Sequence, residues 1–195
     1  MDLFDAIRAG NVAEVRRILS ADPGLAALRR PDGISAVLAA RYRQDQDLVD
    51  AVLEAAPELD LFDAAALGRV DRLAELLDAD PELANAWAPD GFPPLSLAAF
   101  FGQPQAVDLL LTRGADVGAV SRNAMQVQPL HAATAARNAE AVTLLLNAGA
   151  DPDARQQGGW TPLAAARHAG QDAIADILLA HGADPTTPVP EGTVA

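Results

Sequence analysis

The sequence predicts an all-α fold, a solenoid of helix-turn-helix repeats with short hairpin loops, and three repeated patterns predict it. Gly-Ala-Asp recurs at spacings of 35 and 33 residues, at 114–116, 149–151 and 182–184. Pro-Leu recurs at the same two spacings, at 94–95, 129–130 and 162–163. Leu-Phe-Asp-Ala and Pro-Asp-Gly each return after 58 residues, at 3–6 and 61–64, and at 31–33 and 89–91. Periods of this kind indicate stacked units that bury a core between neighbours.

The elements of one unit are clearest in the last copy. Thr161 is a suitable helix N-cap, and Pro162 takes the first helical position, where its missing N–H costs nothing. A short alanine-rich helix over 163–169 then ends at Gly170. A second helix is predicted from apolar residues at helical spacing, Ile174, Ile177 and Leu178. Gly182 ends that helix, so each unit is predicted to be a helix, a turn, a helix and a loop.

The same pattern extends upstream and defines the predicted domain. Second helices are carried by apolar clusters at Val12–Leu19, Leu48–Leu53, Leu73–Leu77, Val107–Leu111 and Leu144–Leu146. One repeat domain is therefore expected over residues 1–185, in units of approximately 3–31, 32–60, 61–89, 90–122, 123–157 and 158–185. Residues 186–195 show no apolar periodicity and are expected to form a flexible C-terminal tail.

Composition narrows the classes of function. The 195 residues carry a net charge of −13, all 14 basic residues are arginine, and cysteine is absent. Because binding a nucleic-acid backbone needs clustered cations, a nucleic-acid partner is not expected. No apolar run approaches the ~18 residues of a membrane span, so neither a membrane partner nor a signal peptide is expected. We expect a monomeric cytoplasmic protein, and the arginine and alanine bias favours a bacterial source.

Residues that could carry chemistry are sparse. His131, His168 and His181 stand apart from one another, and none is paired with a second histidine at metal-ligand spacing. The aspartates of the three Gly-Ala-Asp turns are explained by bonds to nearby backbone donors. No Gly-rich phosphate loop follows an apolar strand. The sequence therefore predicts no catalytic residue, no metal site and no cofactor, and the chain is not expected to be an enzyme.

Three segments in register carry a family resemblance, namely DGFPPLSLAAFFGQPQAVDLLLTRGAD, QPLHAATAARNAEAVTLLLNAGAD and GGWTPLAAARHAGQDAIADILLAHGAD. They resemble the ankyrin repeat, whose unit has about 33 residues, a TPLH-type helix start and a Gly-Ala-Asp-type turn. The resemblance covers residues 3–185 as six units and is clearest from 90 onward. No unit keeps both the Thr and the His of TPLH. The second unit reads as one residue short, with Arg43 in place of the glycine between its helices.

The resemblance implies a concave binding face made by the hairpin loops and first helices, and a convex back made by the second helices. The family's usual contact positions follow the loop glycine and precede the inter-helix glycine. Matching these motifs onto the chain predicts a partner-binding set of Phe92, Phe100, Phe101, Ile34, Arg41, Tyr42, Met125, Val127, Trp160 and His168, with Ala135, Ala136 and Ala169 beside them.

Phe100 and Phe101 leave two interpretations open. Adjacent helical residues point in different directions, so both rings cannot share one narrow core stripe. Either the pair marks a contact site on the concave face, or Phe100 packs between first helices as core.

The leading functional prediction is a noncatalytic scaffold or adaptor that binds an unidentified protein partner through the concave face. The alternative is an acidic inhibitor or mimic that occupies a basic nucleic-acid-binding protein. An enzyme is the third class.

The first unit should behave as an end cap. A terminal repeat must pack inward and remain polar outward, so Phe4 and Ile7 should be buried while Arg8, Arg16 and Arg17 lie near or on the surface. Phe62, at the place equivalent to Phe4, should be buried as well.

Overall fold

The computed structural model describes residues 1–190, and that part of the chain holds twelve α-helices and no strand beyond a single bridge between Arg29 and Ser35. The helices follow one another in pairs: α1 (Leu3–Arg8) and α2 (Val12–Ala21), α3 (Ala36–Tyr42) and α4 (Gln46–Leu53), α5 (Leu61–Leu67) and α6 (Val70–Ala79), α7 (Pro94–Phe100) and α8 (Pro104–Thr112), α9 (Pro129–Ala135) and α10 (Ala139–Asn147), α11 (Pro162–His168) and α12 (Asp172–Ala180). Three short 3₁₀ turns lie in the loops, at Pro23–Ala27, Pro81–Asn85 and Gln157–Gly159. The all-α fold class predicted from the sequence is confirmed.

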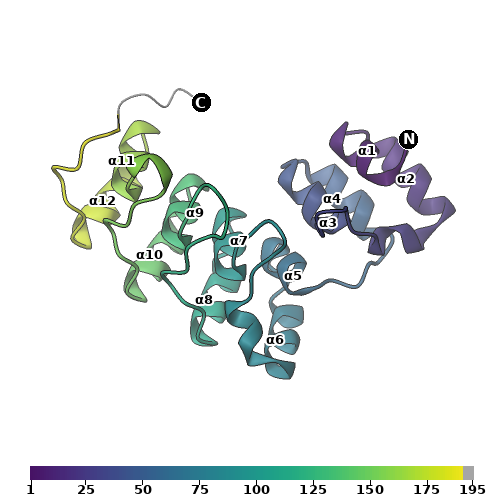
Figure 1. Ribbon diagram of the computed structural model, residues 1–195, viewed down its shortest axis with the longest axis horizontal. Coiled ribbons are helices and arrows are strands. Elements are labelled where there is room, and N and C mark those ends of the chain that lie inside the picture. The colour runs from purple at the N-terminus through teal and green to yellow at the C-terminus, as the bar shows by residue number, and fades with distance from the viewer. Residues whose placement is uncertain (191–195) are drawn as a thin grey trace.

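The pairs stack into an elongated, curved array, with α1 and α12 at opposite ends (Figure 1). The first helices of successive pairs pack against one another from α1 to α11. The second helices pack likewise, α2 on α4, then α6 on α8, α8 on α10 and α10 on α12. The step from α4 to α6 is different, because these two helices lie apart and a segment without secondary structure at 56–60 joins their pairs (Figure 1).

Local sequence accounts for the helix starts. The side chains of Ser35, Asp60 and Thr161 each accept a hydrogen bond from a backbone N–H three residues ahead, which satisfies one orphan donor of the first turn. Proline takes the first position of α7, α9 and α11. Gly91 is required by its φ of 85° and by a neighbouring loop, since a Cβ there would lie 2.8 Å from the carbonyl carbon of Arg122.

The turn between α3 and α4 corrects the register inferred from the sequence. Arg43 has right-handed helical angles, and the left-handed residue is Gln44, with φ of 54°. In the last pair the left-handed residue is Gly170, two residues after the end of α11. Gln44 stands at the same distance from the end of α3, so Arg43 occupies the contact position that had been given to Tyr42, and no residue is missing there.

The core consists of two apolar clusters that meet at α5 and α7. One gathers the buried residues of α1–α4 together with Ala66, Ala88, Leu97 and Phe101, and the other gathers those of α5–α12. Phe62 and Phe100 pack against both clusters. This arrangement connects the two halves through a few large side chains.

The end-cap expectations hold in part. Ile7 is buried and Arg8, Arg16 and Arg17 are exposed, as expected. Phe4 and Phe62 are half-buried, because each packs on the margin of a cluster instead of inside it. In the tail, Thr187 is buried, Asp184 accepts hydrogen bonds from the backbone and hydroxyl of Thr186, and the Thr187 N–H donates to the Asp184 carbonyl oxygen, so hydrogen bonds hold the turn at 184–187. The rest of the predicted tail, 191–195, lies outside the described residues.

Candidate functional site

The first helices and the hairpin loops form one face of the stack, called here the first-helix face. A cavity of about 330 Å³ opens on it between α7, α9 and the loops that precede them. We call it the apolar pocket, and its lining is Tyr42, Phe92, Ser96, Leu97, Phe100, Met125, Val127, His131, Ala132, Ala135 and Gln156. A volume of this size is at the lower end of the range typical of ligand pockets.

Half of the partner-binding set predicted from the sequence meets in this pocket. The structure brings together Tyr42, Phe92, Phe100, Met125 and Val127, which come from four separate segments of the chain. Tyr42 and Met125 are 37% and 50% exposed, and the other three residues are half-buried. The predicted residues therefore line one common surface, although their binding role stays a prediction.

The two adjacent phenylalanines divide their roles, and the surface placement expected for Phe101 is wrong. Phe101 is 8% exposed, because it caps the C-terminus of α7 beneath the rings of Phe100 and Tyr42, at centroid distances of 5.0 and 5.4 Å. Phe100 is half-buried and lines the pocket. The ring that lines the apolar pocket is therefore Phe100, and the buried ring of Phe101 packs against it.

Ile34 is also corrected. It is 5% exposed and belongs to the cluster of α1–α4, because the turn at Asp32 and Gly33 directs the next residue into the core. Its position directly after a loop glycine is what had placed Ile34 in the predicted partner-binding set. Ile34 therefore offers no free surface to a partner.

Arg41 is half-buried between the pairs rather than free on the face. Its guanidinium donates hydrogen bonds to the carbonyl oxygens of Ala66 and Phe101, at 3.2 and 3.1 Å, and lies 4.9 Å from the centroid of the Phe101 ring. Burial lowers the pKa of Arg41 from its ordinary value. These contacts join α3 to α5 and α7, so Arg41 helps to hold neighbouring helix pairs together.

Trp160 and His168 lie together at the far end of the face. Their rings meet edge to face at a centroid distance of 5.2 Å, with Trp160 half-buried and His168 exposed. Neither residue lines the apolar pocket. The backbone oxygen of Trp160 is tied to the pocket wall, because it accepts a hydrogen bond of 3.2 Å from His131 Nε2.

His131 and Ser96 add polar atoms to an otherwise apolar lining. A carbonyl oxygen only accepts, so the bond to Trp160 assigns the proton of neutral His131 to Nε2. Burial lowers the pKa of His131, which keeps the ring neutral. Ser96 is 1% exposed and its hydroxyl has no hydrogen-bond partner. Ser96 is absent from the predicted partner-binding set, although it takes the place that His131 has in the next pair.

A second cavity adjoins the first and is basic. It has a volume of about 230 Å³ and is lined by Phe4, Ile7, Arg8, Arg30, Ala39, Tyr42 and Arg43, so Tyr42 separates it from the apolar pocket. We call it the basic pocket. Arg8 pairs with Asp5, and Arg30 pairs with Asp32 at 2.6 Å. Arg43 is absent from the predicted partner-binding set, because the register error at Gln44 gave its contact position to Tyr42.

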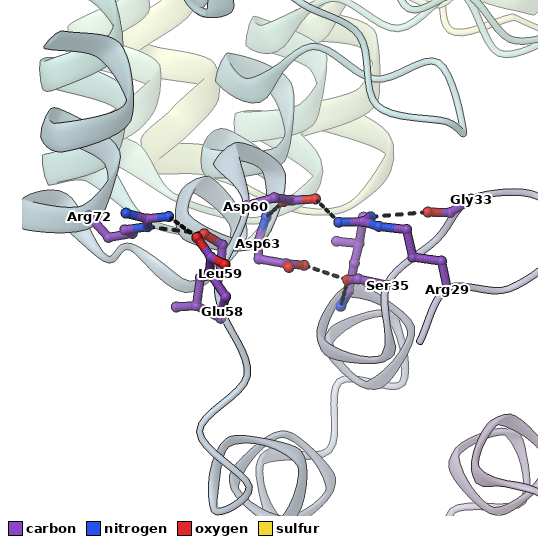
Figure 2. A network of polar contacts seen from close by, with 9 residues as sticks. Arg29, Gly33, Ser35, Glu58, Leu59, Asp60, Asp63 and Arg72 are labelled. Atoms are coloured by element: carbon purple, nitrogen blue, oxygen red, sulfur yellow. Dashed lines mark hydrogen bonds and ion pairs between the residues drawn. The ribbon is translucent and has the colours of Figure 1, made fainter. Parts of the chain in front are cut away.

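The interface where α3 packs against α5 is called here the α3–α5 seam. It holds the only buried carboxyl group among residues 1–190, that of Asp63 (Figure 2). The Ser35 hydroxyl donates a hydrogen bond to Asp63, and Arg29 pairs with Asp60 at 2.7 Å. Burial, reinforced by the nearby Asp60 carboxylate, raises the pKa of Asp63 to about 6, against the opposing effect of the Ser35 hydrogen bond. Asp63 lines neither the apolar pocket nor the basic pocket, so we expect it to affect the stability of the fold.

Among residues 1–190, no three His, Asp or Glu side chains gather in a way that could hold a metal ion. No helix of the described part is long and apolar enough to cross a bilayer. The chemistry available on the first-helix face is apolar contact, hydrogen bonding and attraction to anions.

Comparison with known proteins agrees with this architecture. The family model described as ankyrin repeats, in three copies, matches residues 61–156 and 95–188. Over 95 residues the chain is 43% identical to the probable E3 ubiquitin-protein ligase XBOS31 of Oryza sativa subsp. japonica, an alignment covering 48% of this chain and 21% of that protein. It is 33% identical over 128 residues to ankyrin repeat and SAM domain-containing protein 6 of Rattus norvegicus, covering 62% and 14%. It is 32% identical over 123 residues to a putative ankyrin repeat-containing protein of Treponema pallidum (strain Nichols), covering 58% and 41%. The chain thus spans less than half the length of each of these relatives.

Proposed function

This chain belongs to the ankyrin repeat family, and we propose that it is a noncatalytic scaffold that binds a protein partner on the first-helix face. Ankyrin repeats generally mediate protein–protein interaction. The observation that carries the proposal is the apolar pocket, which gathers five predicted contact residues from separate segments on one face. A cavity lined by aromatic rings and a half-exposed methionine suits the anchor side chain of a partner.

The experiment is affinity capture from the organism's own lysate with wild type and a pocket-filled variant. Ala135 is exposed at the end of α9 and lines the pocket, so Ala135→Phe fills the cavity without removing a contact. Ala173→Phe is the matched control, because Ala173 is exposed on α12, away from the first-helix face. We expect one protein to be enriched by wild type and by Ala173→Phe, and to be lost with Ala135→Phe. Equal capture by all three would contradict binding at the pocket.

A second candidate is the acidic mimic, and the distribution of charge favours it over an enzyme. The six second helices carry ten Asp or Glu and three Arg, whereas the six first helices carry two Asp and three Arg. A basic partner would therefore bind the back of the stack. Its capture would weaken steeply between 50 and 300 mM salt and would be unaffected by Ala135→Phe.

A further inference from the structure

The first-helix face carries two cavities of opposite character side by side. The apolar pocket and the basic pocket share Tyr42 as a common wall, and their volumes are about 330 and 230 Å³. The Tyr42 hydroxyl is fixed by a hydrogen bond to Asp90, so the wall between them is held in place by the loop that also presents Phe92. One extended ligand that crosses Tyr42 would therefore contact both cavities.

The basic pocket has one arginine more than its acidic partners. Arg8 and Arg30 are paired with Asp5 and Asp32, and these pairs are largely exposed. Arg43 also lines the pocket, is exposed, and makes no ion pair with any residue in the range 1–190. Three guanidiniums in one small cavity favour an anionic group, which Arg binds through two parallel N–H donors.

The apolar pocket carries its own selective feature. Ser96 is 1% exposed and its hydroxyl is unpartnered, in a lining that is otherwise mostly apolar and aromatic. A buried polar group without a partner is unfavourable, and a ligand group that hydrogen-bonds to it removes that cost. Among side chains large enough to fill the cavity, tyrosine and tryptophan combine an aromatic body with an O–H or N–H.

We propose that the partner is recognised through an extended segment that places a tyrosine or tryptophan in the apolar pocket and an aspartate or glutamate in the basic pocket, on either side of Tyr42. This inference rests on the proposed function and specifies its partner. The overall charge of the chain is −13, yet the segment's carboxylate meets a cavity whose lining holds three arginines and no acid. The charge complementarity is therefore confined to the basic pocket, and the same arginines disfavour binding of a strongly basic segment there.

The test uses the full chain and a random library of linear 12-residue peptides displayed on phage. We expect the enriched peptides to share Tyr or Trp together with Asp or Glu. Binding of a synthetic copy, measured by fluorescence anisotropy, should weaken at least 10-fold with Ala135→Phe and at least 3-fold with Arg43→Gln. The matched controls Ala173→Phe and Arg69→Gln should bind as wild type, because Ala173 and Arg69 line neither pocket.

The outcomes separate this inference from the proposed function. If no peptide is enriched, if the enriched peptides lack acids, or if Arg43→Gln binds them as wild type does, the inference is overturned. Binding that requires a phosphorylated residue in place of Asp or Glu also overturns it. In each case partner capture that is lost with Ala135→Phe would still support a protein-binding face. Should Ala135→Phe fail to fold, as seen by circular dichroism, Met125→Glu at the half-exposed rim serves the same purpose.

Discussion

The seam between α3 and α5 and the seam between α7 and α9 join equivalent first helices by different means. At the α7–α9 seam the buried side chains are largely apolar, and α8 packs on α10 behind them. At the α3–α5 seam a hydrogen bond from Ser35 reaches the buried carboxyl group of Asp63, and α4 does not pack on α6. A repeat array can thus keep its period while the energy of its interfaces changes from one junction to the next.

The duplicated Leu-Phe-Asp-Ala motif shows that the burial of an aspartate depends on whether another helix pair is stacked against its helix. Asp5 in α1 and Asp63 in α5 occupy the same place in that motif. Asp5 is half-buried and pairs with Arg8, whereas Asp63 is 2% exposed. The difference arises because α5 has the preceding pair stacked on it and α1 has none. Residues 1–54 and the rest of the array should therefore unfold with different free energies.

The largest expected effect comes from opening the core on each side of the seam. Leu48 in α4 and Leu130 in α9 are both fully buried, so Leu48→Ala and Leu130→Ala should each cost about 2–5 kcal/mol of local stability. Hydrogen exchange measured by mass spectrometry should show faster exchange confined to α1–α4 for Leu48→Ala. Equal acceleration across all twelve helices would show that the seam does not divide the array.

A smaller effect is expected from neutralising Asp63. The pKa of Asp63 is raised to about 6 in the folded state, whereas an aspartate in the unfolded chain releases its proton near pH 4. The free energy of unfolding therefore falls as the pH rises from about 4 to about 6. Asp63→Asn keeps an acceptor for Ser35 and removes the buried charge. The variant should gain about 1–3 kcal/mol over wild type at pH 7.5 and much less at pH 4.5. Urea denaturation at the two pH values measures the difference.

The matched control for that prediction is Asp5→Asn. Asp5 lies in the same motif without a pair stacked in front of it, so its replacement should change stability by less than about 1 kcal/mol at either pH. An equal gain in the free energy of unfolding for both variants at pH 7.5 would mean that the change in net charge causes the effect. The burial of Asp63 at the α3–α5 seam would then not be its cause.

These cases show what the sequence determined and what it did not. The period of the Gly-Ala-Asp and Pro-Leu markers was enough to predict the helix pairs, and the resemblance to the ankyrin repeat implied the face on which Tyr42, Phe92 and Phe100 meet. It was not enough to place Phe101, which packs against Tyr42 of the preceding pair, or Ile34, which the turn at Asp32 and Gly33 directs into the core. Arg43 was missed since a left-handed Gln44 replaces the glycine that usually marks the turn.

Arg41 connects the seam to α7 and should have an intermediate effect. Its guanidinium bonds to two carbonyl oxygens and lies over the Phe101 ring, a geometry that lysine does not reproduce. Arg41→Lys should lower the free energy of unfolding by about 1–2 kcal/mol. Arg69→Lys is the control, because Arg69 is exposed and should tolerate the change. Equal stability of the two variants, measured by thermal unfolding, would mean that Arg41 does not couple the pairs.

The smallest effect concerns the ion pair between Arg29 and Asp60 at the edge of the seam. The side chains are 47% and 28% exposed, so Arg29→Gln should cost less than about 1 kcal/mol, and less again in 0.5 M salt. The change should be clearer in the titration of Asp63. The positive charge of Arg29 lowers the pKa of Asp63, whereas the charge of Asp60 raises it.

Removing Arg29 should therefore move the midpoint of the Asp63-dependent stability change to higher pH, and Asp60→Asn should move it to lower pH. Both shifts are measured as the difference between each variant and the same variant carrying Asp63→Asn. Opposite shifts would locate the titrating group at this seam, because Arg29 and Asp60 face Asp63 from the two sides that the seam joins (Figure 2). Shifts in the same direction would mean that another carboxyl group carries the pH dependence, and that the two regions of the array are not distinguished by Asp63.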